Sequence, residues 1–262
     1  MKKIVLFFLG SLLLLLCSCG SKKDDTSSSS SITTEEAAQI VGVSLASNNN
    51  GVVDAVGEAA NISTNSSSLL KSANSSIIKT DTITVSGTKL NAAGASVAFN
   101  STKIYKLILV SNDSATLSIP KTVTAMHSCT GSVTAPLYTE THVSSGTFNY
   151  TNLVTVENST ITQDSIWTLN GTYLRTGTHV ITTTAKSISH TITIKLTNLL
   201  VNKNTKAING GTATVTITGS VKDKGSFSYT GTLVFNGSGV GTLTISGVSY
   251  LINLLTGDVT AK

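Results

Sequence analysis

The sequence predicts an all-β protein, an antiparallel meander that forms a curled sheet or a sandwich, with a short helical segment before it. From about residue 77 to residue 262, apolar residues alternate with Thr and Ser, which is typical of strands that bury one face and expose the other. The chain has only two prolines, Pro120 and Pro136, so little interrupts the hydrogen-bond ladders. Clusters of Gly, Asn, Asp and Ser separate the alternating runs, as hairpin turns require.

Residues 1–18 predict a lipoprotein signal peptide. Two lysines precede an apolar run over residues 4–16, which is shorter than the roughly 20 residues of a transmembrane helix. Leu16 and Ser18 then occupy the positions of a lipobox whose cysteine is Cys19. The alternative is an ordinary cleaved signal without a lipid. Acyl chains such as palmitate on Cys19 would hold the protein to a membrane almost permanently.

Residues 19–31 predict a flexible, Ser-rich tether, because such a chain has no apolar surface to bury. Shortly after the cysteine come four charged residues, Lys22, Lys23, Asp24 and Asp25. This motif resembles the signal that exports lipoproteins of the Bacteroidota to the outer face of the outer membrane. It also fits a solvated tether without an export role, and both interpretations can hold together.

Residues 32–76 predict a short helical hairpin followed by a Ser/Asn-rich linker. Thr33 and Glu36 have the spacing of a capping box, and the apolar residues that follow them fall on one helical face. Residues 48–51, Asn-Asn-Asn-Gly, break this helix, and a second helical run covers 52–60. Helices this short and polar are marginal alone, so we expect them to pack against other elements or to fray.

The β-domain is expected over residues 77–262. Its clearest alternation lies over 212–218, and the other expected strands include 82–85, 104–110 and 116–119. Turns are expected at three places. Residues 222–225 and 236–239 would close C-terminal hairpins, and Asn170-Gly171 is the strongest two-residue hairpin signal in the chain.

Four stretches of the β-domain carry a resemblance to known proteins. They are Ser128-Cys129, the run from Trp167 to Gly177, the run from Gly211 to Gly219 and the run from Gly225 to Thr232. In this order they resemble a group of uncharacterised lipoproteins of the outer membrane and cell surface of the Bacteroidota. The resemblance covers roughly residues 128–262 and implies an all-β fold and surface placement, and it implies no particular activity.

Charge is scarce in this chain, at 12% of residues. Loss of the signal takes two lysines from the 18 Lys and Arg, which leaves 16 against 13 Asp and Glu, a formal net charge of +3. The lysines are scattered and Arg175 is the only arginine, so the clustered basic residues of a nucleic-acid-binding surface are missing. Cys129 alone remains free after lipidation, and we expect it to be buried and inert.

The sequence contains none of the common catalytic motifs. It has no G-x-S-x-G elbow, no H-E-x-x-H, no P-loop and no G-x-G-x-x-G after a strand. Glu157 and Asp164 are the only local carboxylate pair that suits glycoside hydrolysis, and a solvated loop pair is the simpler interpretation. We therefore expect neither an enzyme nor a cofactor.

Four residues of the β-domain could ligate zinc. His127 and Cys129 share one strand face, as do Glu140 and His142. A hairpin that turns near residues 134 and 135 would set His127 opposite His142 and Cys129 opposite Glu140. A slip of one residue would destroy the cluster, and the alternative is a row of polar residues on a solvent-exposed face. Because no close-spaced ligand motif is present, we expect no metal.

Trp167, Tyr173 and Arg175 are candidates for ligand binding. An aromatic and arginine patch on a surface sheet could stack on a sugar ring and hydrogen-bond its hydroxyls. In the alternative, structural interpretation, Trp167 anchors the core and Arg175 pairs with a nearby carbonyl or acid.

Three Asp-Ser/Thr-apolar stretches resemble the O-glycosylation sites of exported Bacteroidota proteins. Their acceptor residues would be Thr82, Ser114 and Ser165. Glycans there would add bulk and solubility.

These observations predict a non-enzymatic, lipid-anchored protein of the outer membrane, exposed at the cell surface, with a binding or structural role. Its partner would be a glycan or another envelope protein. The alternative is a periplasm-facing envelope protein that holds an apolar ligand such as a lipid. A deep apolar cavity with few Tyr or Trp at its mouth would favour the alternative, and an exposed Trp167 would favour glycan binding.

Overall fold

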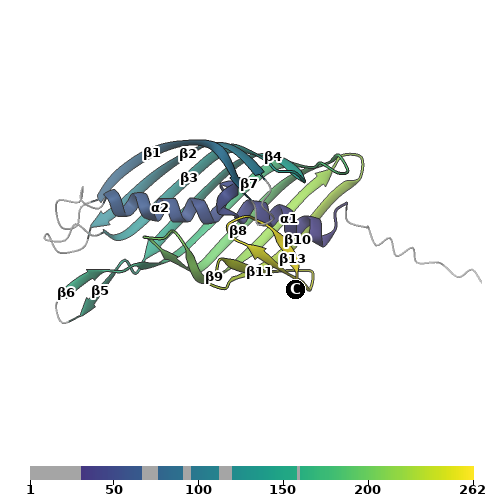
Figure 1. The fold of residues 1–262 in the computed structure, drawn as a ribbon. Coiled ribbons are helices and arrows are strands. Elements are labelled where there is room, and N and C mark those ends of the chain that lie inside the picture. Colours follow the sequence, from purple (N-terminus) through teal and green to yellow (C-terminus); the bar gives the residue numbers. More distant parts are fainter. Residues whose placement is uncertain (1–30, 67–75, 91–95, 112–119, 158–159) are drawn as a thin grey trace, which may run out of the picture.

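The computed structural model describes residues 31–66, 76–90, 96–111, 120–157 and 160–262. One antiparallel sheet of 11 strands dominates it, in the order β1-β2-β3-β4-β7-β8-β9-β10-β11-β12-β13. The sheet curls around two helices that lie along its concave side, and its first and last strands are not paired with each other (Figure 1). The prediction of an all-β curled meander with a short N-terminal helical segment is confirmed.

The long strands come first in the sheet and the short strands last. Their bounds are β1 Ser76–Leu90, β2 Ser96–Ser111, β3 Pro120–Thr134, β4 Tyr138–Thr151, β7 Ile166–Ile181, β8 Lys186–Asn202, β9 Ile208–Val221, β10 Gly225–Phe235, β11 Val240–Ile245, β12 Val248–Asn253 and β13 Val259–Ala261. Between β4 and β7 the chain forms a separate hairpin, β5 (Val154–Glu157) and β6 (Thr160–Gln163), which projects from one end (Figure 1).

The first helix, α1 (Thr34–Leu45), begins at the predicted capping box. The Glu36 N–H donates to Thr33 Oγ1 (3.1 Å), and the Thr33 N–H donates to Glu36 Oε2 (2.8 Å). The Asn-rich break contains a short 3-10 helix, η1 (Ser47–Asn49). The second helix, α2 (Val52–Ser66), runs beyond the predicted range of 52–60. In the described part of the chain, neither helix has the length and apolarity needed to cross a membrane.

Both helices are buried on nearly all sides, because the sheet surrounds them. The helix α2 contacts β2 and β3 on one side and β8 on the other, while α1 contacts β11, β12 and β13. Small residues allow this close approach: a Cβ atom on Gly42 would lie 2.5 Å from the carbonyl oxygen of Gly257. The expectation that the helices pack against other elements is confirmed.

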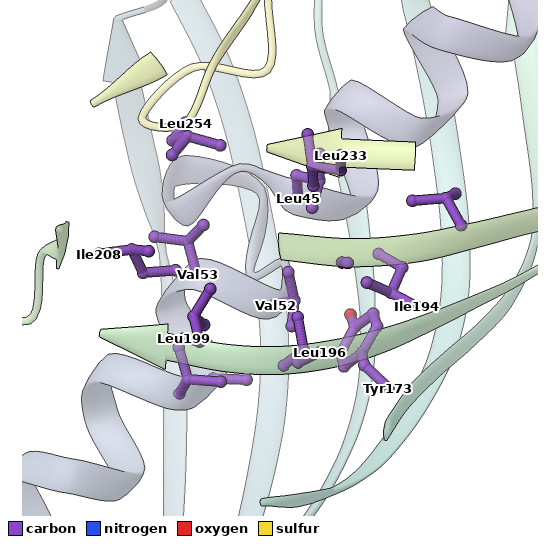
Figure 2. Close-up of a cluster of buried hydrophobic side chains, with 14 of the residues drawn as sticks. Leu45, Val52, Val53, Tyr173, Ile194, Leu196, Leu199, Ile208, Leu233 and Leu254 are labelled. Atoms are coloured by element: carbon purple, nitrogen blue, oxygen red, sulfur yellow. The ribbon is translucent and has the colours of Figure 1, made fainter. Parts of the chain in front are cut away.

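Apolar side chains from the helices and the sheet form one continuous core (Figure 2). Its members include Leu45, Val52, Val53, Tyr173, Ile194, Leu196, Leu199, Ile208, Leu233 and Leu254. Burial of such side chains provides about 1.5–3 kcal/mol each, which is the main reason why helices of this length are ordered.

Two of the three predicted turns are confirmed. Residues 222–224 join β9 to β10, and residues 236–239 join β10 to β11. The predicted strands 82–85 and 104–110 lie within β1 and β2, and 116–119 falls outside the described residues.

The predicted hairpin at Asn170-Gly171 is wrong, since β7 continues through both residues. The two residues form a β-bulge instead, in which Asn170 Oδ1 accepts the Asn198 N–H (2.9 Å). Gly171 is needed there for packing, because a Cβ atom would lie 2.4 Å from the Thr147 carbonyl oxygen. The dipeptide thus serves a close strand contact rather than a chain reversal.

Candidate functional site

The inner face of the sheet has a polar end and an apolar end. The polar end consists of Glu140, His142, Arg175, His179 and His190, all of them buried. The apolar end lies further along the same strands and consists of Phe148, Tyr150, Trp167 and Leu169, also buried. Because side chains alternate between the two faces of a strand, both sets point toward the helices.

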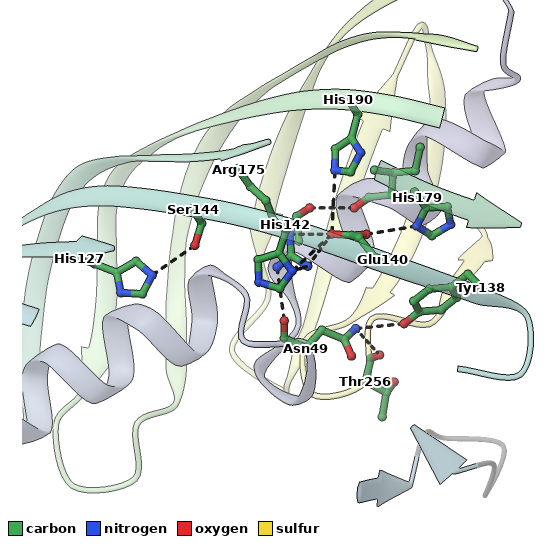
Figure 3. Close-up of polar contacts among 12 residues, drawn as sticks. Asn49, His127, Tyr138, Glu140, His142, Ser144, Arg175, His179, His190 and Thr256 are labelled. Atoms are coloured by element: carbon green, nitrogen blue, oxygen red, sulfur yellow. Dashed lines mark hydrogen bonds and ion pairs between the residues drawn. The ribbon is translucent and has the colours of Figure 1, made fainter. Parts of the chain in front are cut away.

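Glu140 is the centre of the polar end (Figure 3). Its Oε1 atom lies 2.8 Å from Arg175 Nε and 2.5 Å from Arg175 Nη2, and its Oε2 atom lies 3.1 Å from His179 Nδ1. Burial alone would raise the pKa of Glu140, but Arg175 and the hydrogen bond from His179 hold this pKa well below its usual range. Glu140 is therefore an ionised carboxylate inside the protein.

His142 and His190 lie on either side of this ion pair. Each has a ring nitrogen 4.0 Å from Glu140 Oε1, and His142 Nδ1 accepts a hydrogen bond from Arg175 Nη2 (3.0 Å). Burial and the charge of Arg175 lower the pKa of His142 to about 3 and that of His190 to about 4, although Glu140 acts in the opposite direction. Both imidazoles are consequently neutral at ordinary pH.

Glycines make room for these rings. His142 pairs with Gly131 on one side and with Gly177 on the other, and His190 pairs with Gly177 and Gly219. A Cβ atom on Gly131 would lie 3.0 Å from His142 Nε2. The alternation of Gly and His across neighbouring strands thus lets two large polar rings pack inside a tightly curved sheet.

Arg175 and Asn49 connect the polar end to the break between the helices. Arg175 Nη1 donates to the Asn49 carbonyl oxygen, and Asn49 Nδ2 donates to Tyr138 Oη and to the Thr256 carbonyl oxygen, each at 3.3 Å (Figure 3). The sheet, the helical break and the C-terminal loop therefore meet at one hydrogen-bonded network.

A cleft of about 430 Å³ opens beside this network. Its walls come from α1, the β3–β4 turn, the end of β7 and the C-terminal loop. The apolar lining residues are Val43, Ala135, Pro136, Leu137, Ile181 and Val259, and the polar side chains are Gln39, Tyr138, His179, Thr183 and Asp258. This volume and this largely apolar lining are typical of small-molecule sites.

His179 links the cleft to the buried ion pair. Its ring lines the cleft, stacks on Tyr138 (centroids 4.9 Å apart, planes at 22°) and directs Nδ1 toward Glu140. Burial raises the pKa of Tyr138 to about 12, so its hydroxyl stays protonated. The cleft therefore combines apolar walls with one precisely oriented imidazole.

The four candidate zinc ligands do not form the predicted cluster, because the register assumed for the β3–β4 hairpin is wrong. His127 lies opposite Gly146, and Cys129 lies opposite Ser144. Within the described residues, no group of three or more His, Cys, Asp and Glu side chains could hold a metal ion.

The alternative of a solvent-exposed polar face is also wrong for these four residues. All of them are buried. His127 lies among the rings of Tyr105, Phe148 and Tyr173, and burial lowers its pKa to about 4. Burial raises the pKa of the Cys129 thiol, in agreement with an inert cysteine.

Trp167, Tyr173 and Arg175 point into the molecule, each with 0% exposure. Trp167 packs edge-on against Tyr150 (5.9 Å) and donates from Nε1 to the Asp164 carbonyl oxygen (3.1 Å). A surface platform for a sugar would need these side chains exposed. Their placement fits the structural interpretation, in which Trp167 anchors the core and Arg175 pairs with an acid.

The remaining candidates lie elsewhere. Glu157 is the last residue of β5 and pairs with Thr160, and Asp164 lies four residues beyond Thr160, so the extended backbone keeps the two about 13 Å apart. Thr82 and Ser165 are exposed. Three sets of candidates fall outside the described residues: Ser114, Cys19 with its lipobox, and Lys22, Lys23, Asp24 and Asp25.

Sequence reasoning missed His179 and His190 and the partnership of Glu140 with Arg175. A signal was present, because Arg175 stands two residues after Tyr173, and His190 stands two residues before Ile192, in phase with the apolar alternation. All four histidines of the chain and its only arginine are on the buried face. Comparison with protein-family models, with curated proteins and with solved structures finds no match to this chain.

Proposed function

We propose that this chain is a non-enzymatic, lipid-anchored protein of the bacterial outer membrane that binds a small, largely apolar ligand. The observation that supports the ligand is the cleft of about 430 Å³ beside the polar end. A cleft of this size can enclose an alkyl chain or a molecule of similar bulk. Of the two functions that the sequence suggests, this geometry favours the holder of an apolar ligand.

The experiment is a fluorescence titration with N-phenyl-1-naphthylamine, an apolar probe that brightens when it leaves water. The test variant is Thr183→Trp, because Thr183 is exposed at the cleft and a large ring there would fill its mouth. The matched control is Thr184→Trp, the next residue, which is exposed and does not line the cleft. We expect saturable binding by the native chain and the control and at least tenfold weaker binding by Thr183→Trp. Equal binding by both variants would place the probe elsewhere and refute the proposal.

The anchor and its side of the membrane are tested in cells. We expect a palmitate analogue to label the native chain, and we expect no labelling of the Cys19→Ala variant. Protease added to intact cells should cleave the native chain if Lys22, Lys23, Asp24 and Asp25 direct it outward, with a periplasmic marker as the leak control. Protection until the outer membrane is broken would contradict surface exposure and leave a periplasm-facing protein.

A glycan or an envelope protein is the second candidate partner. The observation that favours it is a shallow depression of about 610 Å³ on the outer face of the sheet, lined mainly by hydroxyl side chains. They include Thr141, Thr176, Thr178, Ser189, Thr191 and Thr218. A glycan-array screen of the native chain and of Thr176→Lys tests it, and binding that Thr176→Lys leaves unchanged would exclude this surface.

A further inference from the structure

The polar residues that line the cleft indicate which chemical class of apolar ligand it binds. This inference rests on the proposed function. His179 is 2% exposed, and its ring is held from two sides. Tyr138 stacks on its face, and Glu140 Oε2 lies 3.1 Å from Nδ1. The ring therefore has one orientation relative to the cleft that it lines.

The ionised carboxylate of Glu140 decides which nitrogen of His179 carries the proton. A carboxylate can only accept hydrogen bonds, so the Nδ1 atom must be the donor. In the singly protonated ring, Nε2 is then an acceptor. Among the described residues, Glu140 is the only hydrogen-bond partner of the His179 ring, which leaves Nε2 without a protein partner.

The charge of the cleft discriminates against anions. Among the described residues that line it there is no Lys or Arg, whereas the carboxylate of Asp258 belongs to the lining. The nearest arginine, Arg175, lies behind Glu140 and is paired with it at 2.5 Å. An anionic head group in the cleft would meet an acceptor nitrogen and a negative charge, and it would find no cation to pair with.

We propose that the cleft selects an apolar molecule that ends in a neutral hydroxyl group, and that this hydroxyl donates a hydrogen bond to His179 Nε2. The apolar body lies against Val43, Leu137 and Ile181. The Glu140–Arg175 pair acts as a positioning device, because it fixes the tautomer of His179. An apolar ligand without a hydroxyl would cover Nε2 and leave this acceptor unpaired, which is costly, so the hydroxyl gives selectivity as well as affinity.

The probes are 1-octanol, octanoate and 1-chlorooctane, which share a chain of eight carbons and differ in the terminal group. Binding to the Cys19→Ser chain, which has no acyl chains of its own to compete, is measured by calorimetry at pH 8.5, where histidine is generally neutral. We expect 1-octanol to bind about tenfold more tightly than octanoate and about tenfold more tightly than 1-chlorooctane.

The variant His179→Phe keeps a ring under Tyr138 and removes the acceptor. We expect it to bind 1-octanol about tenfold more weakly and 1-chlorooctane as the native chain does, which also shows that the cleft is still formed. Octanoate binding as tightly as 1-octanol, or 1-octanol binding unchanged in His179→Phe, would overturn this inference and leave the proposed function intact. Failure of all three probes to bind the native chain would overturn the proposed function together with it.

Discussion

The polar end and the apolar end of the inner face are built on the same strands, yet they are held in different ways. At the apolar end, Tyr150, Trp167 and Leu169 are fixed mainly by contact area and shape, with one hydrogen bond each from Tyr150 Oη and Trp167 Nε1 to a carbonyl oxygen. At the polar end, Glu140 and Arg175 are fixed by charge and by directed hydrogen bonds. Removal of one polar partner leaves the other buried without compensation, whereas loss of an apolar group leaves only a cavity. The arrangement of the polar end therefore depends on charged and hydrogen-bonded partners that must be present together, and its stability depends on pH.

The largest expected effect is a loss of folding stability in acid, because three buried histidines are neutral in the folded protein. His127, His142 and His190 have pKa values lowered to about 4, 3 and 4, against an ordinary value of 6.5. Between pH 6.5 and pH 5 the unfolded chain therefore binds protons that the folded protein does not. The free energy of unfolding should fall by about 1.5 kcal/mol for each of these histidines over this window.

Urea denaturation at pH 8, 6.5 and 5 measures this loss. The variant His127→Leu, which keeps an apolar group among the surrounding rings, should lose about one third less stability than the native chain between pH 6.5 and pH 5. An identical acid dependence of the variant and the native chain would show that His127 is not a neutral buried imidazole.

The next largest effect is expected for Arg175→Met, which leaves Glu140 buried without its cation. Breaking a buried ion pair in this way costs about 3–5 kcal/mol. In the variant, burial raises the pKa of Glu140 above its unfolded value, so the carboxyl folds best when protonated. The destabilisation relative to the native chain should therefore be larger at pH 8 than at pH 5.

The double variant Glu140→Gln with Arg175→Met is the matched control for this charge effect. Because it removes the uncompensated charge, it should be more stable than Arg175→Met at pH 8, and its loss should be nearly the same at both pH values. If Arg175→Met lost equal stability at pH 8 and pH 5, Arg175 would act through packing rather than through charge.

At the apolar end we also expect a substitution to lower the free energy of unfolding, but by an amount that does not depend on pH. Leu169→Ala removes a fully buried side chain and should lower the free energy of unfolding by about 3 kcal/mol. The same loss is expected at pH 5 and pH 8. The control is Leu200→Ala on β8, where the side chain is 38% exposed, and it should cost less than about 1 kcal/mol. A clear pH dependence of the Leu169→Ala loss would remove the distinction between the two ends.

Local signals in the sequence were enough for the fold class, the capping box and two turns. Thr33 and Glu36 satisfy each other within one helical turn, so no tertiary information is needed to predict them. The partners at the polar end depend instead on strand register, which a turn sets. The sequence-based hairpin turned near residue 134, whereas the structure turns at Pro136 and Leu137, where the Ala135 N–H donates to the Tyr138 carbonyl oxygen (2.8 Å).

That shift of two residues in the turn moves every pairing on β4 by four. His127 then faces Gly146 rather than His142, and Glu140 faces Val133 on one side and His179 on the other. Proline favours the second position of a β-turn, so Pro136 did carry the correct signal. The contact between Glu140 and Arg175 joins β4 to β7, which are neighbours in the sheet but are separated in sequence by the β5–β6 hairpin, and no local pattern in the sequence encodes it.

The smallest effect is expected at a hydrogen bond between the apolar end and α2. Tyr150 Oη donates to the carbonyl oxygen of Val56 at 2.6 Å. Tyr150→Phe keeps the ring against Trp167 and should cost about 1 kcal/mol, because the Val56 carbonyl oxygen can still accept its helical hydrogen bond. The loss should be the same at pH 5 and pH 8 and should speed amide hydrogen exchange in α2 about fivefold. Unchanged exchange in α2 would mean that the Tyr150 ring holds the helix by packing rather than by its hydroxyl, and the contrast with the hydrogen-bonded polar end would then be sharper.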